Sequence, residues 1–395
     1  MSVRLGLKDI VIVPAAVSSI EHRSDCDPYV NDDILESMSK RKMLPLFASP
    51  MAAVVNEYNY KTFNLNSINT VIPRTVDIET RIELMTLTFV ALGLNEAIDI
   101  FINRNKYFDK IVNSINPDEA VYICIDIANG HMQKLIDTIK SIKTLYGDEV
   151  IVMAGNIANP ETYRYYAMAG CDYIRCGIGV GSACTSSANG AVHYPMASLL
   201  YDINKIKSSL IEFNKLSEKN GLSDKIKLPK IIADGGCSNF DDIIKCLALG
   251  ADYVMSGKIF AQAFESASKI TPKFIETNEH DLMDIVNNIL NIEKSINKYS
   301  YEELCDIAEK YGLKFNKTYY GMSTKRAQSE MGNDVLKTAE GIQFEVPLKY
   351  TLAGWIDNFK HYLRSAMSYC DAKTLSEFHP KTIQISNAAF NAYYK

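Results

Sequence analysis

Residues 149–186 read EVIVMAGNIANPETYRYYAMAGCDYIRCGIGVGSACTS, and the architecture of the whole chain can be inferred from this stretch. Glu149–Asn156 and Asp172–Gly177 are short apolar runs, and the segment between them, Pro160–Ala169, has the spacing of an amphipathic helix. Both runs are apolar on both faces, as parallel strands buried between two layers should be. The stretch therefore predicts a strand, a helix and a parallel second strand that leads into a glycine-rich loop.

The same unit recurs along the chain. Apolar runs that we expect to be strands occupy Leu44–Pro50, Asn69–Arg74, Thr88–Leu94, Ala120–Ile127, Glu149–Asn156, Asp172–Gly177, Lys230–Gly235 and Tyr253–Gly257. Helical patterns lie between them at Met132–Tyr146, Pro160–Ala169, Ala197–Glu218 and Phe240–Leu249. Repeated βα units predict one α/β domain, a (β/α)₈ TIM barrel spanning residues 1–395, with a doubly wound sheet as the alternative.

Polar residues and glycines gather where the expected strands end. The fourth strand ends in Asp126 and continues into Ala128-Asn129-Gly130, and the fifth ends in Gly155-Asn156. The seventh ends in Asp234-Gly235-Gly236 and the eighth in Ser256-Gly257-Lys258. Because active sites of such barrels lie at the carboxyl ends of the strands, these residues are expected to converge on one site.

The loop after the sixth strand, Gly177–Ser186, carries a cysteine. Glycines at 177, 179 and 181 leave the backbone unshielded, and Ser182 and free N–H groups can hold an anion beside Cys184. A thiol placed beside a bound anionic substrate suits covalent attack on that substrate. The alternative is a flexible Gly/Ser turn with an idle cysteine.

Composition excludes several classes of protein. A net charge of −5 argues against general nucleic-acid binding, and no apolar run approaches the length of a membrane span. The nine cysteines form no CxxC pair, their number is odd, and the N-terminus lacks a signal-peptide pattern. A reducing, cytoplasmic location is therefore expected.

Residues 266–317 depart from the alternation of strands and helices. Asp281–Asn297 and Tyr301–Tyr311 have helical patterns, which predicts a helical insertion after the eighth strand. It would lie on the active-site face as a lid, an oligomer contact or a neutral surface addition.

Five motifs in order resemble the IMP dehydrogenase / GMP reductase family over nearly the whole chain. They are Lys8–Pro14, Gly155-Asn156-Ile157, the Cys184 loop, Ala233–Gly236 and Tyr320-Gly321-Met322. The regulatory CBS insertion usual after strand two has no room, because too few residues separate Arg74 from Ala120.

Within that family, three features resemble the reductase branch. Cys124–His131 is similar to the reductase Asp-x-Ala-x-Gly pattern, and the expected flap, 323–339, is short. Arg326 is followed by Ala327, so the Arg-Tyr pair with which the dehydrogenases activate water is missing. Glu340–Pro347 and Leu363–Tyr369 resemble reductase C-terminal segments.

The resemblance implies NADPH-dependent reductive deamination of GMP to IMP and ammonia, a step of purine nucleotide salvage. It assigns covalent attack to Cys184, and proton transfer to Ser186, where the family has threonine, together with Glu340. It implies substrate contacts from Ser182, Asp234, Gly236, Gly257, Lys258, Tyr319, Met322, Ser323 and Gly341. It places Asp126, Ala128 and Asn156 beside the nicotinamide ribose. It also implies a monovalent cation, K⁺, at the carbonyls of Gly179, Gly181 and Cys184, and a homotetramer.

Departures from the family pattern, which also include Lys337 in place of arginine and Ala339 in place of serine, leave the substrate open. Met51 is followed by Ala52-Ala53 where the family has aspartate, and the insertion is longer than the usual connection. A reductase for a modified or deoxy guanine nucleotide is therefore an alternative, as are oxidation of IMP to XMP with NAD⁺ and a catalytically inactive nucleotide-binding barrel.

Overall fold

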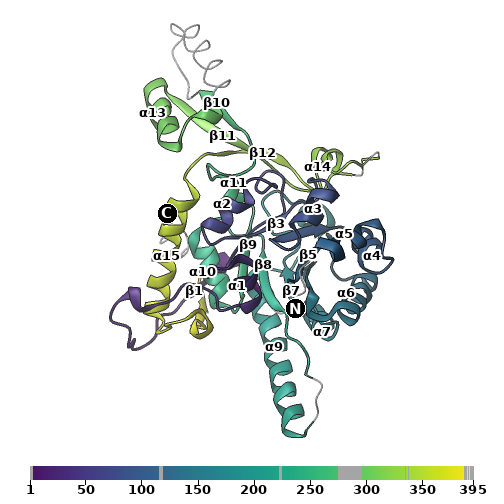
Figure 1. The fold of residues 1–395 in the computed structure, drawn as a ribbon. Helices are drawn as coiled ribbons and strands as arrows, with labels where there is room; N and C mark the ends of the chain where they lie inside the picture. The colour runs from purple at the N-terminus through teal and green to yellow at the C-terminus, as the bar shows by residue number, and fades with distance from the viewer. Residues whose placement is uncertain are drawn as a thin grey trace.

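The computed structural model describes residues 3–114, 119–221, 225–274, 296–333, 335–336, 338–386, 389 and 391. Its centre is a closed barrel of parallel strands, each hydrogen-bonded to the next in chain order, and the last to the first (Figure 1). The barrel strands are β2 (Leu46–Ala48), β3 (Asn69–Ile72), β4 (Phe89–Leu92), β5 (Val121–Asp126), β6 (Val150–Ile157), β7 (Tyr173–Cys176), β8 (Lys230–Asp234) and β9 (Tyr253–Ser256). All eight expected strands are thus confirmed, and the doubly wound sheet is wrong.

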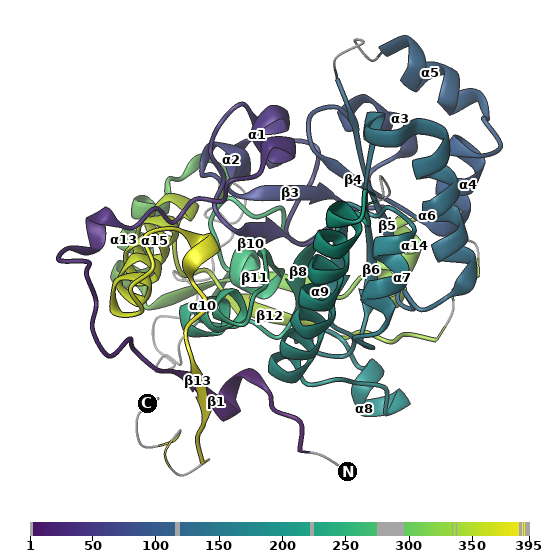
Figure 2. The same cartoon turned by 90° about the horizontal axis from the view of Figure 1, so that it is seen from below.

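Helices surround the barrel (Figure 2). They are α2 (Tyr60–Leu65), α3 (Ile78–Leu84), α4 (Leu94–Phe101), α5 (Lys106–Ser114), α6 (Gln133–Tyr146), α7 (Thr162–Met168), α8 (Ser186–Gly190), α9 (Met196–Lys219), α10 (Phe240–Ala248) and α11 (Lys258–Ala261). The four expected helices correspond to α6, α7, α9 and α10. Single turns of 3₁₀ helix are η1 (Leu7–Asp9), η2 (Arg23–Asp25), η3 (Gly147–Glu149), η4 (Ile296–Lys298) and η5 (Leu375–Glu377).

The two ends of the chain pack together outside the barrel. Strand β1 (Ile10–Ile12) pairs antiparallel with β13 (Thr382–Gln384), which follows the long helix α15 (Leu352–Tyr369) (Figure 2). Helix α1 (Asp33–Ser39) lies against the amino-terminal end of the barrel, where its N-cap Asp32 is buried. The phenols of Tyr173 and Tyr253 donate to Asp32 at 2.9 and 2.7 Å, so α1 closes that end of the barrel.

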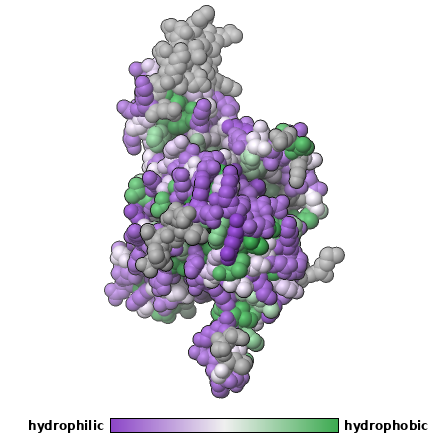
Figure 3. All heavy atoms as spheres, turned by 45° about the vertical axis from the view of Figure 1, so that its right-hand side comes forward, coloured by the Kyte–Doolittle hydropathy of each residue, from purple (hydrophilic) through white to green (hydrophobic). Residues whose placement is uncertain are grey.

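The barrel interior is filled with side chains. Phe47, Phe89, Tyr173 and Tyr253 are fully buried and make edge-to-face or tilted ring contacts. Such packing leaves no channel, and the carboxyl ends of the strands remain the place for a site. The face in Figure 3 is mainly hydrophilic. Among the residues described, no helix combines the length and apolarity of a membrane span.

The insertion contains strands as well as a helix. Tyr301–Tyr311 is the helix α13, as expected, whereas residues 281–295 of the other expected helix lie outside the described residues. Strands β10 (Ile270–Phe274), β11 (Leu313–Tyr320) and β12 (Gln343–Pro347) form an antiparallel sheet that projects beyond the barrel with α13 (Figure 1). Alternate residues of β11 are buried, which is the two-residue period of a strand.

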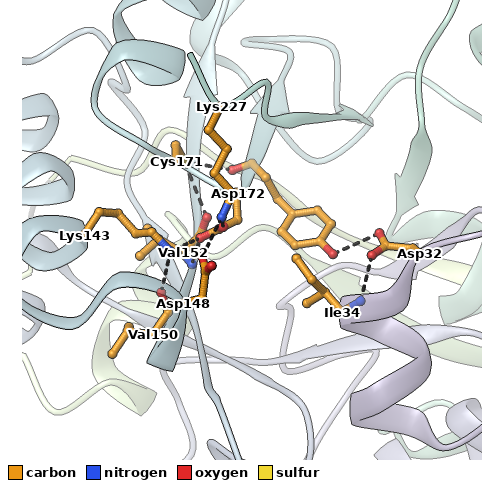
Figure 4. Close-up of polar contacts among 10 residues, drawn as sticks. Asp32, Ile34, Lys143, Asp148, Val150, Val152, Cys171, Asp172 and Lys227 are labelled. Carbon is orange, nitrogen blue, oxygen red and sulfur yellow. Dashed lines mark hydrogen bonds and ion pairs between the residues drawn. The ribbon is translucent and has the colours of Figure 1, made fainter. Parts of the chain in front are cut away.

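A buried ion-pair cluster fixes the amino-terminal end of the barrel (Figure 4). The side chain of Asp172, with no exposed surface, accepts from the Val152 amide at 2.7 Å and from Lys143 at 2.9 Å. Lys227 lies 2.5 Å from its other oxygen. The cluster joins α6, β6 and the start of β7.

Replacing Asp172 by asparagine is therefore expected to lower the free energy of unfolding by about 3–5 kcal/mol, because the buried Lys143 would keep only the exposed Asp148, at 3.6 Å, as a counter-charge. Urea denaturation measures the change. Asp357→Asn removes an exposed partner of Lys360 and should leave stability unchanged. Equal effects of the two substitutions would contradict the expectation.

Candidate active site

A cavity of about 480 Å³ opens at the carboxyl ends of the barrel strands. Its walls come from the segments after β2 and β3, the ends of β5 to β9, the Cys184 loop, and the stretch that follows β11. Met331, at the end of α14 (Lys325–Glu330) in the flap, adds a further wall. This volume falls in the range of small-molecule sites.

More than half of the residues expected from the sequence line this cavity. They are Cys184, Gly181, Asp234, Gly257, Tyr319, Met322, Ser323, Asp126, Ala128 and Asn156. They come from distant parts of the chain, and the fold brings them into one hollow.

The other expected residues lie behind or beside the wall. Gly236 follows the lining residue Gly235, and Lys258 is the first residue of α11, next to Gly257. Gly341 faces Ala183 and Ser323, since a Cβ on Gly341 would lie 3.1 Å from the Ala183 carbonyl and 3.0 Å from the Ser323 hydroxyl. For Ser186, the structure describes the backbone at the start of α8 and not the side chain.

The segment directly after the flap is hydrogen-bonded to the cysteine loop. The Thr185 amide donates to the Glu340 carbonyl at 2.9 Å, and the Ile342 amide donates to the Ala183 carbonyl at 3.0 Å. Cys184 itself forms a β-bridge with Gly341. Glu340 is exposed, and its backbone is held directly beside the residue that follows the thiol.

Cys184 differs from most other cysteines of the chain. Six of the nine are buried, and burial raises the pKa of Cys124, for example, to about 12. Cys184 is half-buried and lines the cavity. Because the thiolate is the nucleophilic form, a thiol that meets solvent and ligand is better placed to react than a fully desolvated one.

Arg175 lies beneath the cavity and was not expected from the sequence. Its guanidinium donates to Asp126 at 2.5 Å and to one oxygen of Asp234 at 2.8 and 3.0 Å. Asn156 donates to the same Asp234 oxygen at 2.7 Å. Burial disfavours the charge on Arg175, but the two carboxylates outweigh burial and raise its pKa. The network fixes the positions of both carboxylates and leaves the second oxygen of Asp234 for a ligand hydroxyl.

Close backbone approach at this site requires glycine at two positions. A Cβ on Gly155 would lie 2.5 Å from the carbonyl of Arg175, and a Cβ on Gly257 would lie 2.7 Å from the Tyr319 hydroxyl. Tyr319 also hydrogen-bonds Ser182, and burial raises its pKa, so the phenol stays neutral and can donate. Ser182, Gly257 and Tyr319 therefore belong to one contact group.

Arg74 is the second cavity residue that the sequence did not reveal. Its Nε is buried without a hydrogen-bond partner among the described residues, although it lies 3.4 Å from Glu96. A guanidinium at a cavity wall suits an anionic or hydroxyl-rich ligand.

Comparison with known proteins agrees with this geometry. Residues 100–277, which include β5 to β9 and the Cys184 loop, match the IMP dehydrogenase / GMP reductase domain. A GMP reductase of Vibrio campbellii is 25% identical, over 99% of this chain and 98% of its own. Those of Caenorhabditis elegans and Vibrio vulnificus are 25% and 26% identical, over 95% and 96% of this chain and 89% and 93% of their own. The chain is therefore similar to the IMP dehydrogenase / GMP reductase family, through this domain and through GMP reductases matched over nearly its whole length.

Two of the three carbonyls that the family resemblance assigns to a monovalent cation already accept hydrogen bonds. The Gly179 carbonyl accepts from the Ser187 hydroxyl at 2.8 Å, and the Gly181 carbonyl accepts from the Cys184 amide at 3.0 Å. A carbonyl has two lone pairs, so one remains on each for an ion. Within the described ranges, no group of three or more His, Cys, Asp or Glu side chains is arranged to hold a metal ion.

Arg175 could have been recognised from the sequence. It is the one charged residue in Tyr173-Ile174-Arg175-Cys176, a strand otherwise too apolar to face water. A buried arginine requires carboxylate partners; in the expected barrel Asp234 ends the next strand, and Asp126 ends the strand two places earlier. Arg74 carries no such signal, because a charged residue after a strand is common.

Proposed function

We propose that this protein is a GMP reductase, which converts GMP to IMP and ammonia with NADPH as the reductant. One observation carries the proposal: Cys184 lines the cavity, and a backbone hydrogen bond joins the next residue to Glu340. The reductases among its relatives, matched over nearly their whole length, support the choice of branch. The enzyme is an oxidoreductase with a nicotinamide cofactor.

The proposed reaction begins at the thiol. The Cys184 thiolate adds to C2 of guanine, and the exocyclic amine leaves as ammonia after it receives a proton. A covalent thioimidate remains on the sulfur. When bound, NADPH supplies the hydride that reduces C2. The thiolate is then expelled and IMP is released, so a thiol serves first as nucleophile and then as leaving group.

The proton for the departing amine is assigned to Glu340 together with the Ser186 hydroxyl. Glu340→Gln is expected to lower the rate of ammonia release by about 10²–10⁴-fold, because an amide cannot supply the proton. Single-turnover kinetics with GMP measure this step. Glu345→Gln is the matched control, since Glu345 pairs with Lys273 on the outer sheet and does not line the cavity. Unchanged ammonia release in Glu340→Gln would refute the assignment.

The phosphate and the ribose are assigned to separate groups. Ser182, Tyr319 and the amides of Gly236, Gly257 and Lys258 hold the phosphate. The free oxygen of Asp234 accepts from the ribose, and Met322, Ser323 and Gly341 border the base. The nicotinamide ribose lies at Asp126, Ala128 and Asn156, which border the same cavity as Cys184. Arg74, which lines the cavity, supports an additional polar contact on this side.

One comparison of substrates tests the function. NADPH oxidation and ammonia release are measured side by side with GMP, dGMP and IMP. Stoichiometric consumption of GMP and NADPH supports the proposal, and formation of XMP from IMP and NAD⁺ would overturn it. A preference for dGMP would favour the second candidate, a deoxy-nucleotide reductase, which is motivated by Ala52-Ala53 directly after the cavity residue Met51.

A further inference from the structure

A lysine without exposed surface lies in the sheet behind the cavity wall. Lys317, in the middle of β11, donates from Nζ to the carbonyls of Ala263, Phe264 and Ser266 at 2.9, 2.8 and 3.0 Å. The Ser266 hydroxyl is a fourth oxygen, at 2.8 Å. These four oxygens form the ammonium cage discussed below.

The cage is unusual because none of its four oxygens is a carboxylate. Burial of a lysine is costly, and it lowers the pKa of Lys317 to about 7, while the charge of Glu265 opposes that shift. The Glu265 carboxylate accepts from the Leu352 amide at 2.9 Å, so it also serves the start of α15. Only the protonated amine offers three donors, and the oxygens of the cage match that form.

The cage joins two parts of the active-site wall. Its oxygens belong to the turn after α11, whose N-cap Gly257 lines the cavity. Lys317 and Tyr319 are two residues apart on β11, so their side chains leave the same face of the strand. Tyr319 lies against Gly257 and Met51, and β11 ends where Gly321, Met322 and Ser323 line the cavity.

Two further contacts link the same elements. The Ser268 hydroxyl donates to the Thr318 carbonyl, and Lys317 is in register with Ile270 on β10 and Val346 on β12. From β12 the chain leads back to Glu340 and Gly341 beside Cys184. A displacement of β11 would therefore shift both the wall at 319–323 and the segment that carries Glu340.

We propose that Lys317 is a positioning residue for the nucleotide site: its ammonium fastens β11 to the turn after α11 and so places Tyr319 to Ser323 against the ligand. The consequence for turnover rests on the proposed function, whereas the consequence for wall position and nucleotide binding does not. The Lys317 ammonium is a positive charge held by backbone carbonyls, as a bound monovalent cation would be.

Lys317→Met tests the proposal because methionine keeps much of the stem and removes the ammonium. The dissociation constant and KM for GMP are expected to rise about tenfold or more, with a smaller change in kcat, because binding depends on the wall. Lys314→Met is the matched control, since Lys314 is exposed on the same strand. Calorimetry with GMP measures binding without turnover. Binding by Lys317→Met that equals the unsubstituted protein would overturn the proposal.

Chemical rescue separates positioning from general stability. Lys317→Ala leaves the cage open, and ethylammonium should restore GMP binding at least severalfold while tetramethylammonium, which cannot donate, should not. The K⁺ concentration is held constant, and Lys314→Ala should respond to neither. Loss of binding that ethylammonium fails to restore, in a variant whose circular dichroism is unchanged, would overturn the proposal.

Two further measurements keep the test decisive. Ser266→Ala removes one of the four oxygens and keeps the lysine, so it should weaken GMP binding less than Lys317→Met does. This variant therefore tests the cage even if the lysine variants fold poorly. Hydrogen exchange of the amides at 318–323 should accelerate in Lys317→Met and Ser266→Ala, and unchanged exchange in both would refute the positioning role. If the unsubstituted protein fails to turn over GMP, the proposed function fails, and hydrogen exchange still tests Lys317.

Discussion

Replacing Cys184 by alanine is expected to abolish GMP-dependent NADPH oxidation, with a fall in kcat of at least about 10³-fold, while GMP binding persists. The thiol has no substitute in the proposed reaction, because the covalent step both removes the amine and activates C2. The contacts assigned to binding, at Asp234, Gly257 and Tyr319, come from other strands and are left intact. Steady-state kinetics and calorimetry with GMP measure the two quantities.

A second cysteine provides the control. Cys370 is also half-buried, but it ends α15 and does not line the cavity, so Cys370→Ala should retain full activity. Cys184→Ser should be nearly as inactive as the alanine variant, because a serine hydroxyl is a much weaker nucleophile and a poorer leaving group. Sustained NADPH consumption by Cys184→Ala would mean that the covalent mechanism is wrong.

The barrel could be predicted because its strands are buried on both faces. Parallel strands between layers read as short continuous apolar runs, so the limits of β5 and β7 were found to within one or two residues. The outer sheet was not found, because β10 and β12 have five residues each and contain proline, and β11 is largely polar. Lys317 is one of the buried residues that alternate along β11, whereas a pattern of apolar residues alone predicts that a lysine faces solvent.

The candidate site could be predicted where chemistry requires a special residue. Glycines, an aspartate after a strand and a cysteine in a glycine loop are local signals, and the barrel rule places them on one face. Arg74 and Lys317 gave no local signal, because the meaning of each depends on partners distant in sequence. The roles assigned to Ser186 and Glu340 rest on family resemblance and stay predictions until the kinetic experiments are done.

Replacing Arg175 by methionine is expected to lower the free energy of unfolding by about 3–5 kcal/mol and to remove activity. Arg175 has 7% of its side chain exposed, and the partner carboxylates of Asp126 and Asp234 have 21% and 10%. Without the guanidinium, the carboxylates at the ends of β5 and β8 would repel each other in a poorly solvated floor. Arg175→Lys should recover only part of the loss, because an ammonium cannot reproduce the fork that spans both partners.

The comparison that isolates this effect uses a surface arginine and a compensating change. Arg164→Met removes an exposed arginine from α7, 3.7 Å from Glu161, and urea denaturation should show little change. Arg175→Met combined with Asp126→Asn should be less destabilised than the sum of the single variants, because the second substitution removes one unpaired charge. Additive effects in this double-mutant cycle, and in the corresponding cycle with Asp234→Asn, would mean that Arg175 stabilises the barrel through packing alone. The floor of the cavity would then owe its shape to side-chain volume, and the two carboxylates would need another explanation for their position.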